Sequence, residues 1–282
     1  RTEPLTKREK NTYKVIDSLG KKLGAQRKAN IFSTLLHGKI RYDMVNIDAG
    51  SILGYNQYEG LRLGVNAKLN EKFNRYISPD AFIAYGFKDK NFKYGVGLDV
   101  KTTLDKVSFF RIEYYDAVNT AGRFNENFWN FNMKISNAGI SLNNDRFYHF
   151  KGGKFYFQRD LSNSLSAKIA ASYQNESSRF TYSYKNRGNE FDNFSTKLSL
   201  MYAPFSKNIM TPSGKYTTEK KFPDLFINAE QAFESFGGDF SYTKVDVLLN
   251  HQFTTKWGKT GIRLYGGKVF GDAPIWHNFT MN

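Results

Sequence analysis

The strongest pattern in the chain is a strict alternation of apolar and polar residues, clearest over 61–69 and 92–101. Successive side chains of a β-strand point to opposite faces, so each segment is predicted to be a strand with one apolar and one polar face. The apolar face carries Leu61, Leu63, Val65, Ala67, Leu69, Phe92, Tyr94, Val96, Leu98 and Val100. The polar face carries Arg62, Gly64, Asn66, Lys68, Lys93, Asp99 and Lys101.

The same alternation returns along most of the chain. It is found at 81–87, 110–116, 165–174, 195–203, 244–253 and 260–270. Turn-like stretches rich in Asn, Asp, Gly and Lys join these segments, and no clear helical pattern lies between them. We therefore predict an all-β fold in which the strands form an antiparallel meander.

The apolar faces could meet either a protein core, as in a soluble β-sandwich, or lipid. Aromatic residues gather near the strand ends, for example Tyr85, Phe87, Phe92 and Tyr94 around one hairpin, while the opposite face is rich in Gly, Ser, Asn and Lys. Aromatic girdles beside an outward apolar band and a polar lumen are typical of membrane barrels. We expect residues 49–282 to form an antiparallel transmembrane β-barrel, with further strands outside this chain. The first set of residues above would face lipid, and the second set would face the lumen.

Composition changes this picture little. No run approaches the roughly 18 apolar residues of a membrane helix, and the mean hydropathy is −0.57. A membrane strand needs only about 10 residues with every second one apolar, so a low hydropathy is compatible with a barrel. The absence of Cys excludes disulfides, thiolate metal sites and Cys nucleophiles.

Residues 1–48 break the β-pattern. Val15, Ile16, Leu19 and Leu23 have helical spacing, which predicts a short amphipathic helix in a periplasmic lead-in. The glycines inside this segment weaken a helix, so a loosely ordered linker is the alternative.

No constellation of catalytic residues stands out. The four His residues are scattered, Ser195 is not in a nucleophile elbow, and no helix follows Gly95 and Gly97 to form a phosphate site. We therefore expect neither an enzyme nor a bound cofactor or metal. Arg62 is expected to face the lumen and to pair with Asp99 or Glu113, or else to be a solvated charge.

The formal charge of +15 bears on partners. Lys and Arg on lumen faces and loops would attract anionic lipid headgroups, lipopolysaccharide phosphates or acidic client proteins. No nucleic-acid recognition motif accompanies this charge, which is dispersed, so we expect no nucleic-acid partner.

The stretch "YNQYEGLRLG" resembles the first barrel strand of the BamA-type surface-antigen superfamily, through Glu59, Gly60, Leu61, Arg62, Leu63 and Gly64. The segments "TYKVIDSLGKK", "AYGFKDKNFKYG", "FPDLFINAEQAF" and "GGKVFGDAPIWHNFTMN" look more like a Bacteroidota subgroup with a carboxypeptidase-regulatory-like domain ahead of the barrel. This chain departs from the superfamily in one respect: the superfamily usually carries an Arg-Gly-Phe or Arg-Gly-Tyr motif in a late extracellular loop. The one Arg-Gly pair in this chain is Arg187-Gly188, in a mid-chain segment that is predicted to be a turn. The superfamily motif would then lie beyond Asn282.

The resemblance implies an outer-membrane protein of a Gram-negative cell that acts in the assembly or export of outer-membrane proteins or lipoproteins. Its partners would be outer-membrane lipid, lipopolysaccharide, other envelope proteins and client outer-membrane proteins. A weak seam between first and last strands would open laterally and template client strands. A passive solute pore and a scaffold barrel without clients are the alternatives.

Overall fold

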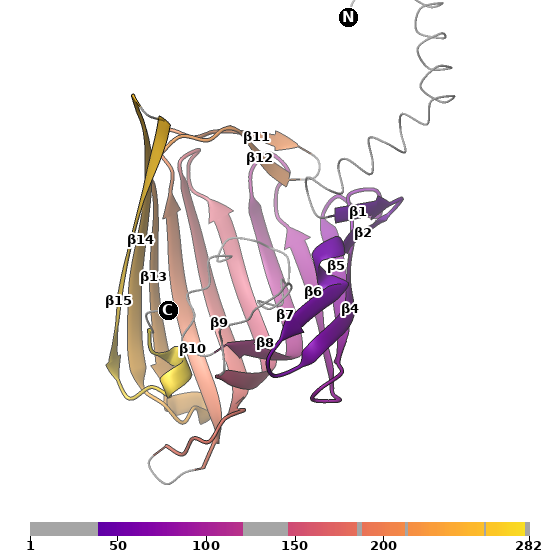
Figure 1. Cartoon of the computed structure of the whole chain (residues 1–282). Helices are drawn as coiled ribbons and strands as arrows, with labels where there is room; N and C mark the ends of the chain where they lie inside the picture. The colour runs from indigo at the N-terminus through magenta and orange to yellow at the C-terminus, as the bar shows by residue number, and fades with distance from the viewer. Residues whose placement is uncertain (1–38, 121–145, 185–187, 212–213, 257, 280–282) are drawn as a thin grey trace, which may run out of the picture.

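The computed structural model describes residues 39–120, 146–184, 188–211, 214–256 and 258–279, and almost all of its regular structure is antiparallel β-strand (Figure 1). Its long strands are β4 (Gly60–Leu69), β5 (Ile77–Gly86), β6 (Phe92–Lys101), β7 (Ser108–Thr120), β8 (Phe147–Asp160), β9 (Leu165–Ser178), β10 (Glu190–Tyr202), β13 (Asp224–Phe233), β14 (Tyr242–Thr255) and β15 (Gly258–Gly271). Three short strands precede them, β1 (Lys39–Tyr42), β2 (Val45–Asp48) and β3 (Leu53–Asn56). The prediction of an all-β antiparallel meander is confirmed.

These strands form one sheet of 13 strands, in which each long strand pairs with its neighbours along the chain. Figure 1 shows the sheet strongly curled, with β15 near one edge and β1 and β2 near the other. In the described part of the chain β15 pairs only with β14, so closure of the sheet into a barrel stays a prediction. The predicted helix near residues 15–23 lies outside the described residues. Within them, no helix has the length and apolar character needed to cross a membrane.

The start of the sheet differs from expectation. Segment 59–64 was predicted to open the first strand, but β2 pairs with one half of β4 and β3 with the other. Between β2 and β3 the one-turn helix η1 (Ala49–Ser51) interrupts the chain, and the Asp48 side chain accepts a hydrogen bond from the Gly50 amide at its start. Within the described residues the sheet therefore begins at Lys39, inside the segment expected to be a lead-in. The alternation was missed because each of these strands has only four residues.

The sheet has two ends, which we name by what lies there. At the η2 end lie the β5–β6 turn, the one-turn helix η2 (Ser235–Gly237) and the segment after β15 with the one-turn helix η3 (Ile275–His277). At the β11–β12 end, a separate hairpin of β11 (Lys207–Thr211) and β12 (Gly214–Glu219) is inserted between β10 and β13.

Candidate functional site

The two faces of the sheet carry opposite chemistry, and the apolar face is the exposed one. On β4 the exposed fraction of Leu61, Leu63 and Val65 is 41–44%, whereas Arg62 is 1% and Asn66 is 6% exposed. On β6, Phe92, Tyr94, Val96 and Val100 are exposed, whereas Lys93 and Asp99 are buried. The half-buried residues are Ala67, Lys68 and Leu69 of β4 and Leu98 and Lys101 of β6. The exposed members of the two sets are therefore all apolar, and the fully buried members are all polar. Contact of the apolar face with lipid, and of the polar face with a lumen, stays a prediction.

The apolar face continues from strand to strand because the register places like residues opposite one another. Val65 lies opposite Ile83, Val96 opposite Tyr114, and Ile169 opposite Leu198. We call this exposed surface the outer band; its members include Leu63, Val65, Ile83, Tyr94, Val96, Ile112, Tyr114, Phe155, Ile169 and Leu198. Exposed apolar surfaces that continue over several strands are uncommon in monomeric soluble proteins.

Arg62 does not pair as predicted. Its Nη1 lies 3.5 Å from Glu59 Oε2, and both side chains are 1% exposed, so it is neither a partner of Asp99 or Glu113 nor a solvated charge. Glu59 precedes β4, and the positive φ of Gly60 (66°) changes the chain direction there. The rule that residues three apart in a strand point to opposite faces therefore does not apply to Glu59 and Arg62. Glu59 Oε1 is also 3.3 Å from Lys93 Nζ, and Asn56 Nδ2 donates to Glu59 Oε2 at 2.5 Å.

Asp99 and Glu113 instead surround Arg111, which is 1% exposed. Two parallel bonds join its guanidinium to Asp80 at 2.6 and 3.0 Å, while Asp99 accepts at 2.8 Å and Glu113 at 2.6 Å. We call these four residues the Arg111 cluster. Lys68 forms a further ion pair with Asp99. Gly97 makes room for the cluster, since a Cβ there would come within 2.3 Å of Arg111 Nη2.

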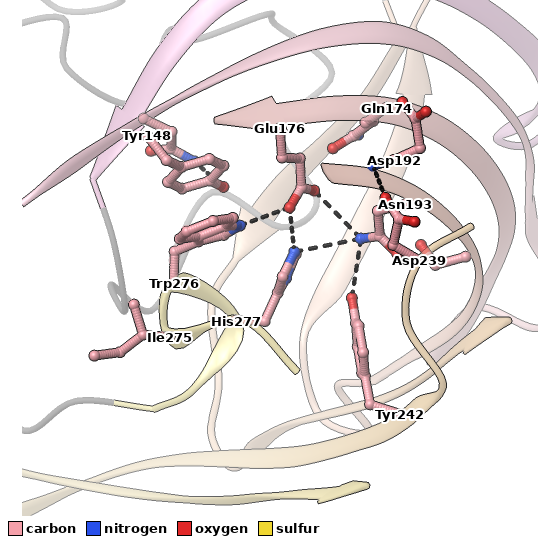
Figure 2. Close-up of polar contacts among 12 residues, drawn as sticks. Tyr148, Gln174, Glu176, Asp192, Asn193, Asp239, Tyr242, Ile275, Trp276 and His277 are labelled. Carbon is pink, nitrogen blue, oxygen red and sulfur yellow. Dashed lines mark hydrogen bonds and ion pairs between the residues drawn. The ribbon is translucent and has the colours of Figure 1, made fainter. Parts of the chain in front are cut away.

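We call the polar, buried face of the sheet the inner face. A second buried cluster on this face lies near the η2 end, around Glu176 of β9 (Figure 2). Trp276 Nε1 donates to Glu176 Oε2 at 2.6 Å, and His277 Nε2 lies 2.7 Å from the same oxygen. Asn193 Nδ2 donates to Glu176 Oε1 at 3.2 Å and also lies 3.1 Å from the Tyr242 hydroxyl. Glu176 is 0% exposed, so these contacts take the place of solvent around its carboxylate. We call these five residues the Glu176 cluster.

Aromatic rings enclose the turn that carries Trp276. Tyr148 stacks on the indole at 5.7 Å between ring centroids, and Tyr182 meets it edge-on at 5.3 Å. The Ile275 amide lies 3.4 Å from the Tyr182 hydroxyl, and Lys244 Nζ donates to the His277 carbonyl at 2.9 Å. Burial raises the pKa of the Tyr182 hydroxyl above its ordinary value, so this hydroxyl stays protonated. The turn is thus bound to the inner face by both polar and aromatic contacts.

The Glu176 cluster is arranged to hold a segment of the chain in place. Its two oxygens contact Trp276, His277 and Asn193 and are shielded from solvent, whereas a general base needs an oxygen within reach of a reactant. No group of three or more His, Asp or Glu suited to a metal ion occurs in the described ranges. Sequence reasoning missed this cluster because Glu176 and His277 are 101 residues apart and neither belongs to a spaced motif. The aromatic "PIWH" stretch was the available signal.

Comparison with known families identifies the chain. A profile described as the C-terminal domain of a family of unknown function (DUF5686) matches residues 37–276. The chain belongs to this family. The match begins close to β1 and ends within η3, so the DUF5686 C-terminal domain contains both the curled sheet and the turn bound at Glu176. No curated protein matches the chain.

Proposed function

We propose that this DUF5686 C-terminal domain is an integral β-barrel of the outer membrane of a Gram-negative, Bacteroidota-type cell. The observation that carries the proposal is the inversion of its faces: Arg62, Lys93 and Arg111 are 1–2% exposed, while the outer band faces outward. A soluble β-sandwich buries its apolar faces between two sheets, so exposure of this band disfavours that alternative. In lipid, the same surface would be the buried one.

The loops support an orientation. At the η2 end the chain passes from β5 to β6, from β7 to β8, from β9 to β10 and from β13 to β14. The strand bounds leave 5, 26, 11 and 8 residues for these connections. At the opposite end the connections from β4 to β5, β6 to β7, β8 to β9 and β14 to β15 take 7, 6, 4 and 2 residues, and the β11–β12 hairpin lies between β10 and β13. Outer-membrane barrels have short periplasmic turns and longer extracellular loops. The η2 end would therefore face the exterior, and the β11–β12 end the periplasm.

The function we propose is the assembly or export of outer-membrane proteins or lipoproteins, by the barrel alone or as one subunit of a larger complex. Support comes from the resemblance of Glu59–Gly64 and the other segments to the BamA-type superfamily and to its carboxypeptidase-regulatory-like subgroup. In the proposed mechanism, a seam between the first and last strands opens and pairs with a strand of the client protein, since an exposed strand edge can pair with an added strand. Lipid, lipopolysaccharide, envelope proteins and client proteins would be the partners.

A passive solute pore is the second candidate, and one observation weighs against it. The turn at η3 occupies the inner face and is fixed there by Glu176 and by aromatic rings. A pore for free diffusion needs an open interior. A scaffold barrel without clients would be compatible with the turn.

Depletion of the protein tests these candidates in cells. Loss of many different outer-membrane proteins would support assembly or export, loss of uptake of one solute would support a pore, and neither change would support a scaffold. Membrane embedding is tested separately on purified protein. A barrel should need detergent, give a β-rich circular dichroism spectrum and migrate differently on gels before and after heating. A compact monomer that stays soluble without detergent would contradict it.

A further inference from the structure

The β11–β12 hairpin does not extend the main sheet. Its two strands pair only with each other, although the chain enters it from β10 and leaves it into β13. Figure 1 shows the hairpin turned across the end of the sheet. The hairpin also has its own ion pairs, in which Glu219 lies 2.9 Å from Lys207 and 3.0 Å from Lys221. It is therefore a distinct element placed over one end of the curl.

Contacts with β8 and the β8–β9 turn show which side of the sheet the hairpin covers. Lys215 Nζ lies 2.9 Å from Asp160 Oδ2, and Asp160 is on the inner face, two residues from Gln158 along β8. Ser166 of β9 donates to the other oxygen of Asp160 at 2.5 Å. A weaker bond runs from Asn208 Nδ2 to the Asn163 carbonyl at 3.4 Å. The hairpin is thus fastened to the inner side.

A row of polar residues crosses the inner face next to Asp160, two residues along each strand and farther from the β11–β12 end. The register places Lys168 between Gln158 and Ser199, and Asn228 between Ser199 and Asp246. Gln158 Oε1, Ser199 Oγ and Asn228 Oδ1 are buried, and none has a hydrogen-bond partner in the part of the chain that the structure describes. Leaving such atoms unsatisfied costs about 1–3 kcal/mol each, and ordered water normally supplies the missing bonds.

We infer that the β11–β12 hairpin is a lid, latched by Lys215 and Asp160, over a hydrated polar layer formed by Gln158, Ser199 and Asn228. The layer takes water molecules as hydrogen-bond donors. The lid separates this water from the solution at the β11–β12 end, which is the periplasm under the proposed function. This inference rests on that proposed function for the lid's location in the cell.

The test uses single Cys reporters in the full chain, which has no native Cys. A water-soluble maleimide is applied to the detergent-solubilised protein, and the labelling rate of Ser199→Cys is measured. In the Lys215→Ala background we expect labelling about fivefold faster, because a partly exposed ion pair contributes modestly to a closed state. Asp160→Asn, which keeps the side-chain size, should act in the same direction.

Two controls make the result decisive. Lys221→Ala removes an ion pair inside the hairpin but leaves the latch, so the labelling rate should not change. Asn228→Cys is a second reporter for the case in which Ser199→Cys folds poorly. Equal rates in the Lys215→Ala and Lys221→Ala backgrounds would overturn the lid. Failure of membrane embedding would be seen separately, as labelling of Val65→Cys by the water-soluble reagent rather than by a lipid-soluble one.

Discussion

The Arg111 and Glu176 clusters both surround a buried charged side chain on the inner face, yet they are built in different ways. The Arg111 cluster draws its four members from the adjacent strands β5, β6 and β7. The Glu176 cluster joins β9, β10 and β14 to a turn beyond β15. The first fixes the register of neighbouring strands, and the second holds one segment against the wall. Damage to them should therefore have different results.

The largest effect is expected from Arg111→Ala. It leaves Asp80, Asp99 and Glu113 buried without their common partner, and breaking a buried ion pair from one side typically costs about 3–5 kcal/mol. The folded fraction should fall sharply in heat-modifiability gels and in urea titrations of the detergent-solubilised protein. Lys72→Ala, which removes a pair that is 63–64% exposed, is the matched control. Equal stability of the two variants would show that the Arg111 cluster contributes little.

Val65→Arg should come next. A charge on the lipid face near the middle of the bilayer costs roughly 2–4 kcal/mol. The expected result is impaired assembly, measured as the fraction of protein that becomes heat-modifiable in outer-membrane preparations. Val65→Thr, which keeps the shape without a charge, should assemble nearly normally. Normal assembly of Val65→Arg would mean that this face does not meet lipid.

Glu176→Ala should release the turn while the sheet stays folded. Hydrogen bonds to a charged group are worth about 1.5–3 kcal/mol, and Trp276 and His277 both lose theirs. With Trp129 and Trp257 replaced by Phe, Trp276 emission should shift to the red and acrylamide should quench it more strongly. Glu176→Gln keeps a carbonyl acceptor and should show a smaller change. Unfolding of Glu176→Ala at the same urea concentration as Arg111→Ala would erase the distinction between the two clusters.

The smallest effect is expected from Lys72→Ala itself. An exposed ion pair contributes at most about 1 kcal/mol and is screened by salt. Its unfolding midpoint should approach that of the unsubstituted protein in 1 M salt. A large loss of stability that persists at high salt would show that residue 72 acts through packing rather than charge.

Strand periodicity predicted the faces well but not the polar contacts. Two-residue alternation is local, so the opposite orientations of Val65 and Arg62 could be read directly. The pairing of Arg62 with Glu59 could not be predicted from the alternation of side chains along a strand, because it depends on the backbone turn at Gly60. The partners of Arg111 required the register between strands, and those of Glu176 required a turn that returns from beyond β15. The short strands β1–β3 fell below the length at which alternation is recognisable.

The distance along the chain between Glu176 and His277 has a kinetic consequence. Most strands of the sheet pair with the next strand in sequence, so each addition closes only a short loop. The contact between Glu176 and His277 spans 101 residues and needs β10, β13, β14 and β15 to be in place first. Contacts of high sequence separation form late and slowly. Burial of Trp276 should therefore be among the last events of folding, and its fluorescence would report completion of the inner face.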